Sequence, residues 1–297
     1  MNTFLSLTKR NVKMFFKDKG MFFTSLITPI ILLVLYATFL AKIYRDSFAS
    51  ALPEGFTIDE KLISATVGGQ LMSSLLAVSC VTVSFCANLL MVQDRVNGAR
   101  KDMLVTPVRR SVVASSYYVG TLLTTVIVSL VATGACFIYL SINGWYLSFG
   151  DVMLIILDVV ILTMFGTALA SVVNVFLTSS GQASAVGTVV SAGYGFICGA
   201  YMPISQFGDG LQKALSLLPG TYGTSLIRNH CLGGVFREMS SVGFPEEVVE
   251  GIKASIDCNL SFFGNSVSIG AMYAVTLGAT ALLIGAFVLI NVLKKRA

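Results

Sequence analysis

Six long apolar segments dominate this sequence and limit what the chain can fold into. Each has about 20 residues or more, the length that an α-helix needs to cross the hydrocarbon core of a bilayer. Only 12% of the 297 residues are charged, against about 25% in soluble proteins, so charges could not cover a water-facing surface. We therefore predict an all-α integral membrane protein with a single membrane domain over residues 1–297. The six expected spans are 21–43, 62–92, 112–141, 152–177, 183–202 and 264–293.

An amphipathic segment, residues 1–19, precedes the first span. Over residues 3–18, apolar side chains cover one broad side at helical spacing, and four cations fill much of the other side. This pattern predicts a helix that lies along the membrane surface, with a solvated basic tail as the alternative. Pro29 is expected to kink or break the first span. No secretory signal peptide is expected, because no small-residue cleavage site follows the cations.

The distribution of Lys and Arg predicts the orientation of the spans. With the N-terminus in the cytoplasm, the cytoplasmic side carries thirteen of the 20 Lys and Arg residues and three acidic residues. The outer side carries the other seven cations and eleven acidic residues. Net charges of +10 inside and −4 outside follow, and they predict a multi-pass protein of the cell membrane with both termini in the cytoplasm.

Small residues accumulate in the fifth segment. In lipid, such residues let helices approach closely, because packing replaces the hydrophobic drive that operates in water. This segment is therefore expected at a helix–helix interface, with a flexible hinge as the alternative. The small residues are Gly187, Ser191, Ala192, Gly193, Gly195, Gly199 and Ala200.

The longest loop, residues 203–263, is expected on the outer side before the last span. Its apolar part, residues 211–227, predicts a short re-entrant or interfacial helical hairpin that is interrupted by Pro219 and Gly220. The polar stretch 238–259 predicts a short amphipathic helix that begins with glutamates. This loop therefore retains helical structure of its own.

Few residues in this chain suit enzymatic chemistry. His230 is the only histidine, and the G-x-x-x-x-G-K-[ST] and G-x-S-x-G patterns are absent, so no catalytic, metal or cofactor site is expected. Asp158 is the only acid well inside a span, ~9 Å from its outer end. It is either a substrate or proton site in a cavity, or a polar group satisfied by a neighbouring helix. Cys231 and Cys258 form either a disulfide on the outer side or two free thiols.

The segment 94–107, between the second and third spans, is the most distinctive part of the sequence. Charges of both signs alternate along it, and Pro107 sets the chain up to re-enter the membrane at Arg109 and Arg110. This pattern predicts a short amphipathic helix at the cytoplasmic membrane face that docks a partner, with a merely positive anchoring loop as the alternative. The residues expected to contact the partner are Asp94, Arg95, Gly98, Asp102, Met103, Leu104 and Pro107.

Taken together, these features resemble the permease subunit of ATP-binding-cassette exporters of the type-2 permease family. The likeness covers essentially the full chain, from an amphipathic elbow helix with the entry Arg10 to Lys19 and Pro29 onward. The loop is similar to the family's coupling helix at Asp94–Arg95, Gly98, Leu104, Pro107 and Arg109. The part after the fifth span is similar at Gly199, Pro203, Leu218–Pro219, Tyr222, Arg228 and Gly233–Gly234.

The resemblance implies a transport subunit with no nucleotide site or cofactor of its own. It implies outward movement of an amphipathic drug, peptide or lipid-like substrate by alternating access. The implied partners are two cytoplasmic ATPase subunits that bind ATP and Mg²⁺, a second copy or a similar permease, and membrane lipid, but no nucleic acid. The alternative is an energy-independent channel or scramblase, which has no need of a coupling segment.

Overall fold

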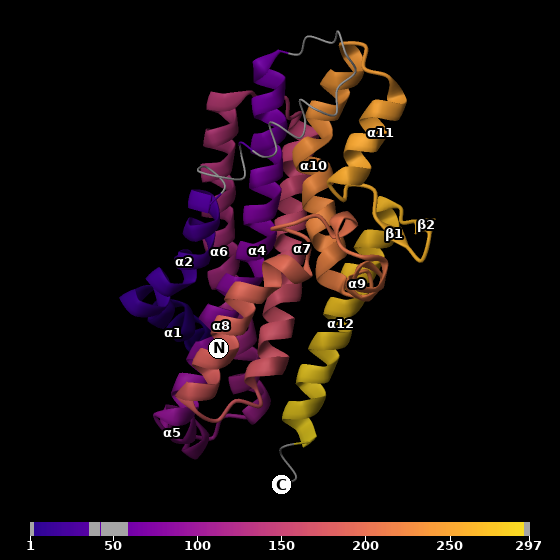
Figure 1. The fold of residues 1–297 in the computed structure, drawn as a ribbon. Coiled ribbons are helices and arrows are strands. Elements are labelled where there is room, and N and C mark those ends of the chain that lie inside the picture. Colours follow the sequence, from indigo (N-terminus) through magenta and orange to yellow (C-terminus); the bar gives the residue numbers. More distant parts are fainter. Residues whose placement is uncertain (1–2, 36–41, 43–58, 294–297) are drawn as a thin grey trace.

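The computed structural model describes residues 3–35, 42 and 59–293, and this part of the chain is all-α apart from one small hairpin. Figure 1 shows the long helices running side by side, with α5 at one end of the molecule. The helices are α1 (Thr3–Lys17), α2 (Lys19–Leu35), α4 (Glu60–Val96), α5 (Ala99–Val105), α6 (Arg110–Asn143), α7 (Phe149–Asn174), α8 (Ser180–Ile197), the 3-10 turn η2 (Ile204–Gln206), α9 (Asp209–Leu215), α10 (Pro219–Ser241), α11 (Glu246–Ser255) and α12 (Ile269–Leu293). The hairpin pairs β1 (Ser261–Phe262) with β2 (Asn265–Ser266).

The longest helix, α4, lies at the centre of the bundle. Helices α2, α6, α7, α8 and α10 pack around it, and 94% of its most apolar window is buried. Small residues allow this close packing. A Cβ atom on Gly69 of α4 would lie 2.6 Å from Cδ2 of Leu232 in α10, and one on Gly166 of α7 would lie 2.9 Å from the Cys80 carbonyl oxygen. The neighbours of α4 therefore touch its backbone surface directly.

Many polar side chains inside the bundle are paired within the chain. Several Ser and Thr hydroxyls of α4 donate to the carbonyl oxygen one turn earlier, as they commonly do in apolar helices. Asn88 of α4 donates to the hydroxyls of Thr121 in α6 and Ser171 in α7, both at 3.1 Å. Asn174 at the end of α7 donates to the Asn88 carbonyl oxygen at 3.1 Å. One amide thus joins three long helices.

In the part of the chain that the structure describes, four helices, α4, α6, α7 and α12, are long and apolar enough to cross a membrane. They match four of the six expected spans and confirm a multi-pass membrane protein. Helix α2 covers the first part of the predicted first span, and residues 36–41 and 43 of that span lie outside the described residues. Helix α8 covers most of the predicted fifth span, with 18 residues rich in Gly, Ser and Ala.

Two prolines bear on the sequence-based prediction. A kink or a break was predicted at Pro29, and helix α2 continues through it without a break. In apolar surroundings, unwinding a helix exposes more backbone groups than one proline removes. Pro219 begins α10 rather than interrupting a helix, because the first turn needs no N–H from its first residue. The predicted hairpin therefore bends at residues 216–218, between α9 and α10. The amphipathic helix predicted in the polar stretch is confirmed as α11.

Gly234 of α10 provides a test of this packing. A Cβ atom there would lie 2.0 Å from the Tyr146 carbonyl oxygen, whereas one on neighbouring Gly233 would lie 3.4 Å from the nearest atom. We expect Gly234→Ala to lower stability by about 1–3 kcal/mol, because the clash involves backbone that cannot rotate away. Thermal unfolding of the detergent-purified protein measures this. Gly233→Ala is the matched control, and equal melting temperatures for the two variants would contradict the close approach.

Candidate functional site

Helix α5 lies at one end of the molecule (Figure 1). Gly98 separates it from α4 with a φ of +82°, in the left-handed region that favours glycine, so the chain turns directly from one helix into the next. Helix α5 has no buried residue, and Val105 at its C-terminus is 87% exposed. The short helix predicted in segment 94–107 is therefore present over Ala99–Val105.

Asp94 fixes the end of α4 from which α5 projects. Its carboxylate is 4% exposed and accepts two hydrogen bonds from the Arg10 guanidinium of α1, one of them 2.9 Å long. The Tyr117 hydroxyl of α6 donates to the same carboxylate at 2.6 Å. The hydrogen bond with Asp94 raises the pKa of Arg10, which holds the ion pair together. Asp94 therefore joins α1, α4 and α6 within the chain, and its contact with a partner stays a prediction.

Arg95 also forms hydrogen bonds with another part of the same chain. Its guanidinium donates to the carbonyl oxygens of Val175, at 3.0 Å, and Leu177, just beyond the end of α7. Met103 and Leu104 of α5 are partly buried against the hydrophobic cluster around Phe15, Met21 and Val113. Among the predicted contact residues, only Asp102 and Pro107 have exposed side chains. The exposed surface of the segment consists of Val96, Asn97, Lys101, Asp102, Val105, Thr106 and Pro107.

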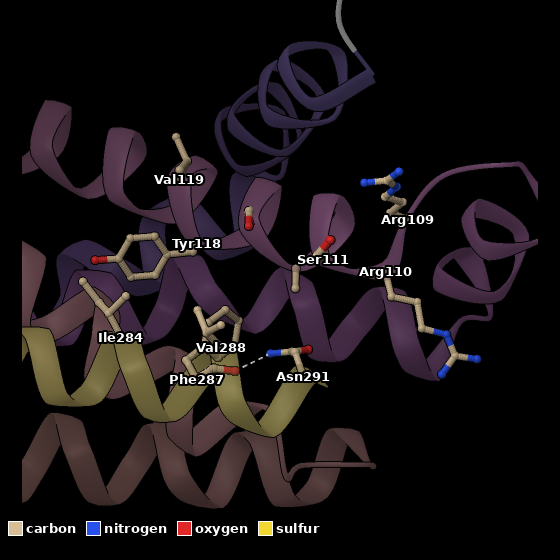
Figure 2. Close-up of a pocket in the computed structure, with 11 residues that line it drawn as sticks. Arg109, Arg110, Ser111, Tyr118, Val119, Ile284, Phe287, Val288 and Asn291 are labelled. Carbon is tan, nitrogen blue, oxygen red and sulfur yellow. Dashed lines mark hydrogen bonds between the residues drawn. The ribbon is translucent and has the colours of Figure 1, made fainter. Parts of the chain in front are cut away.

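After Pro107 the chain enters α6 at two exposed arginines. Arg109 is the residue before α6, and Arg110 is its first residue. Figure 2 shows both at one end of a groove between α6 and α12, with Tyr118 and Ile284 towards the other end. The predicted re-entry of the chain therefore coincides with the start of a long apolar helix.

Asp158 of α7 is bonded to two side chains from other helices. Its Oδ2 atom lies 2.5 Å from Nδ1 of His230 in α10, and the Tyr273 hydroxyl of α12 donates to Oδ1. The His230 and Tyr273 rings lie 6.4 Å apart in a stacked arrangement. The Asp158 side chain is 1% exposed. This geometry matches the prediction of a polar group satisfied by neighbouring helices, and His230 is the partner that sequence reasoning did not assign.

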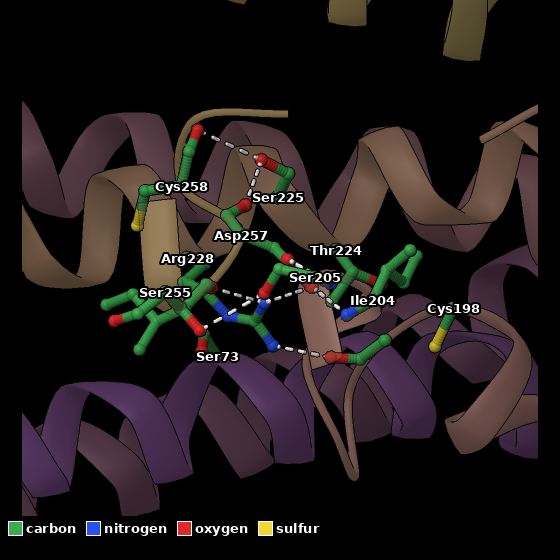
Figure 3. A network of polar contacts seen from close by, with 12 residues as sticks. Ser73, Cys198, Ile204, Ser205, Thr224, Ser225, Arg228, Ser255, Asp257 and Cys258 are labelled. Carbon is green, nitrogen blue, oxygen red and sulfur yellow. Dashed lines mark hydrogen bonds and ion pairs between the residues drawn. The ribbon is translucent and has the colours of Figure 1, made fainter. Parts of the chain in front are cut away.

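A second polar network, around Arg228 of α10, was missed from the sequence. The Arg228 side chain is 1% exposed and faces the Asp257 carboxylate at 3.6 Å. Its guanidinium donates to the carbonyl oxygens of Gly199 and Ile256, both at 2.7 Å. Asp257 in turn accepts from the backbone N–H groups of Ile204 and Ser205. Figure 3 shows this network linking α10 to the chain segments that follow α8 and α11.

The thiols of Cys231 and Cys258 are free and buried, so the structure does not contain the disulfide that the sequence allowed. Burial raises the pKa of the Cys258 thiol to about 12, which keeps it protonated and poorly reactive. Within residues 3–35, 42 and 59–293, no group of three or more His, Cys, Asp or Glu side chains could hold a metal ion.

A large apolar groove lies between α2, α4 and α8. Its volume is about 800 Å³. Side chains such as Ile27, Leu89 and Phe196 provide apolar walls, and Thr188 and Ser191 add hydroxyls. The small residues predicted at a helix–helix interface face open space in part, since a Cβ atom on Gly187 would meet nothing within 4 Å. Helix α8 therefore has room for a further molecule along this side.

The apolar helices packed around a central helix define the class as a multi-pass membrane protein, with an exposed helical segment at one end. The model of the ABC-2 type transporter family matches residues 2–231, and the chain therefore belongs to this family. Members are membrane subunits of transporters that associate with a separate ABC ATPase subunit and generally lack a nucleotide site. A comparison with curated proteins found no match.

The anchoring role of Asp94 can be tested by proteolysis. Asp94→Asn keeps the shape of the side chain but removes the charge that binds Arg10 and Tyr117. We expect the substitution to lower the local stability of the segment by about 1 kcal/mol. Trypsin should then cleave at Arg100 and Lys101 about fivefold faster, because the open form of the segment is more populated. Asp102→Asn, which removes an exposed acid from the same segment, is the matched control. Unchanged cleavage of the Asp94 variant would show that this ion pair does not hold the segment.

The Asp158–His230 pair predicts a measurable coupling. Asp158→Ala is expected to lower stability by about 1–3 kcal/mol, because it leaves the buried His230 and Tyr273 without their acceptor. His230→Ala should add little once Asp158 is absent, so the two losses in melting temperature should not add. A double-mutant cycle by thermal unfolding measures this. Fully additive losses would mean that the two side chains do not interact.

Proposed function

We propose that this chain is the permease of an ATP-driven exporter that moves an amphipathic drug, peptide or lipid-like substrate outward. A separate pair of ABC ATPase subunits would bind ATP and Mg²⁺ in the cytoplasm. The observation that carries the proposal is α5, an exposed helix joined at both of its ends to long helices of the bundle. Such a helix can receive a push from a partner and pass it to the bundle.

The links on either side of α5 support this role. On one side, Asp94 and Arg95 attach the end of α4 to α1, α6 and the end of α7. On the other side, only residues 106–109 separate α5 from α6. Because α4 packs against most of the other long helices, a displacement of α5 would act on the centre of the bundle rather than on its edge. Alternating access requires a movement of this kind.

The groove between α2, α4 and α8 supports an amphipathic cargo. Its walls are mainly apolar, and a few hydroxyls supply hydrogen bonds, which suits a molecule with an apolar body and a polar group. The small residues of α8 would allow a second copy, or a similar permease, to pack closely along the same side. In the dimer that we propose, the groove would become part of a cavity between the two permeases.

We further propose six spans with both termini in the cytoplasm of a plasma-membrane protein. Helices α2 and α8 would supply the two spans beyond the four long apolar helices. The charge difference between the loops supports this orientation, with +10 on the side of α5 and −4 on the side of α11. In this orientation α1 is the elbow helix at the cytoplasmic surface, and its exposed lysines face the lipid headgroups.

Val105 gives the sharpest test of ATPase docking, because it is an apolar side chain that is 87% exposed. We expect Val105→Asp to weaken co-purification of the ABC ATPase partner by about tenfold or more, since a charge at an interface centre is costly to bury. ATP-dependent export in vesicles should fall accordingly.

The matched control is Val242→Asp, the same change at a 57% exposed valine that ends α10. Both variants should stay in the membrane, because neither side chain is buried. Normal ATPase binding by the Val105 variant would remove the support for docking at α5, and equal losses in both variants would mean that the effect is not local.

A further inference from the structure

The groove between α6 and α12 differs chemically from the one beside α8. It has a volume of about 570 Å³ and lies between the first part of α6 and the last part of α12. Its two ends are unlike each other: Arg109, Arg110 and Ser111 lie at one end, and Tyr118 and Ile284 towards the other (Figure 2). The walls between them consist of Ala114, Ser115, Val119, Phe287, Val288 and Asn291. The groove is thus cationic at one end and largely apolar along its length.

The arginines at this end have no acidic partner. The five ion pairs among the described residues all lie elsewhere, at Asp94, Asp151, Asp158, Asp257 and Glu250. Arg100 of α5 adds a third cation: burial lowers its pKa, and the charge of Arg110 lowers it further. Several positive charges therefore gather here, and none of them forms an ion pair within the described residues. An anion at this point would relieve their repulsion.

The start of α6 strengthens the attraction for an anion. Arg109 precedes the first turn, and no side chain caps this helix. The free N–H groups of the first turn and the positive end of the helix dipole therefore point towards the arginine end of the groove. Together with two guanidinium groups, they form the combination that proteins use to bind phosphate.

The length of the groove indicates what kind of phosphate compound it fits. From Arg109 to Val119 the chain advances ten residues, about 15 Å along a helix. The hydrocarbon core of a bilayer is about 30 Å thick, so the groove extends through about one leaflet. A ligand with a phosphate at one end and a hydrocarbon chain of this depth is a phospholipid.

We propose that this groove binds one anionic phospholipid from the leaflet on the side of α5. Arg109, Arg110 and Ser111 hold the phosphate, and an acyl chain lies along Val119 and Phe287. This site is separate from the groove that we propose for cargo, because it lies on other helices. The lipid would bridge α12 to the junction of α5 and α6, so its presence would steady the segment that receives the ATPase.

Native mass spectrometry of the full-length chain in detergent tests the site. We expect one phosphatidylglycerol molecule to be retained, and phosphatidylcholine with the same acyl chains to bind about tenfold less tightly or worse. Arg109→Gln/Arg110→Gln should lower the affinity for phosphatidylglycerol by about tenfold or more. The matched control is Lys13→Gln/Lys17→Gln, which removes two exposed charges from α1. It should keep the bound lipid.

A second variant separates a built site from general attraction between cations and lipid. Ser115 is exposed and lines the groove, so Ser115→Phe fills the space while both arginines remain. We expect this variant to lose the bound phosphatidylglycerol, and an excess of soluble glycerol phosphate to leave the lipid of the unmodified chain in place.

Three outcomes would overturn the proposal. They are equal retention of the two lipids, an equal loss in the lysine control and the arginine variant, and displacement of the lipid by glycerol phosphate. Should Ser115→Phe fail to fold, the comparison of the arginine and lysine variants still decides the question.

Discussion

The structure depends on the requirement that polar groups among apolar helices be paired within the chain, because no water is available to them there. Helix α4 shows several such pairings. Its hydroxyls bond to its own backbone, Asn88 joins it to α6 and α7, and Asp94 joins it to α1 and α6. Each pairing between helices also fixes how the neighbouring helix is rotated about its axis. The hydrogen bonds that satisfy polar groups therefore also determine how the helices pack.

The two buried ionic networks away from α5 also pair polar groups from different parts of the chain. Asp158, His230 and Tyr273 join α7, α10 and α12, and Arg228 with Asp257 closes the turns after α8 and α11. Removing one partner of such a network leaves a buried charge or dipole uncompensated, which costs more than the pair itself contributes. These residues therefore hold the end of the bundle opposite α5 as a unit, while α5 itself stays exposed.

The buried networks and the exposed surfaces serve different purposes. The networks and the close packing of α4 connect the helices of the bundle to one another. The exposed surfaces, in contrast, differ in chemistry. Helix α5 has an exposed apolar side chain at its C-terminus, the groove beside α8 has apolar walls with hydroxyls, and the groove beside α12 has cations at one end. An ATPase, a cargo molecule and an anionic lipid are the respective partners that we propose, and each matches the chemistry of its surface.

The class of protein, the apolar helices and the amphipathic helices α1, α5 and α11 could be predicted from the sequence, because they depend on residue type and spacing within one segment. The exposure of Val105, the burial of Asp94 and the partners of Asp158 could not. Asp158 lies 72 residues from His230 and 115 from Tyr273, and the pairing depends on the rotation of three helices about their axes. A sequence gives the apolar face of each helix. Only packing against the neighbours decides which polar side chains meet, because that choice depends on how all the packed helices are rotated and shifted relative to one another.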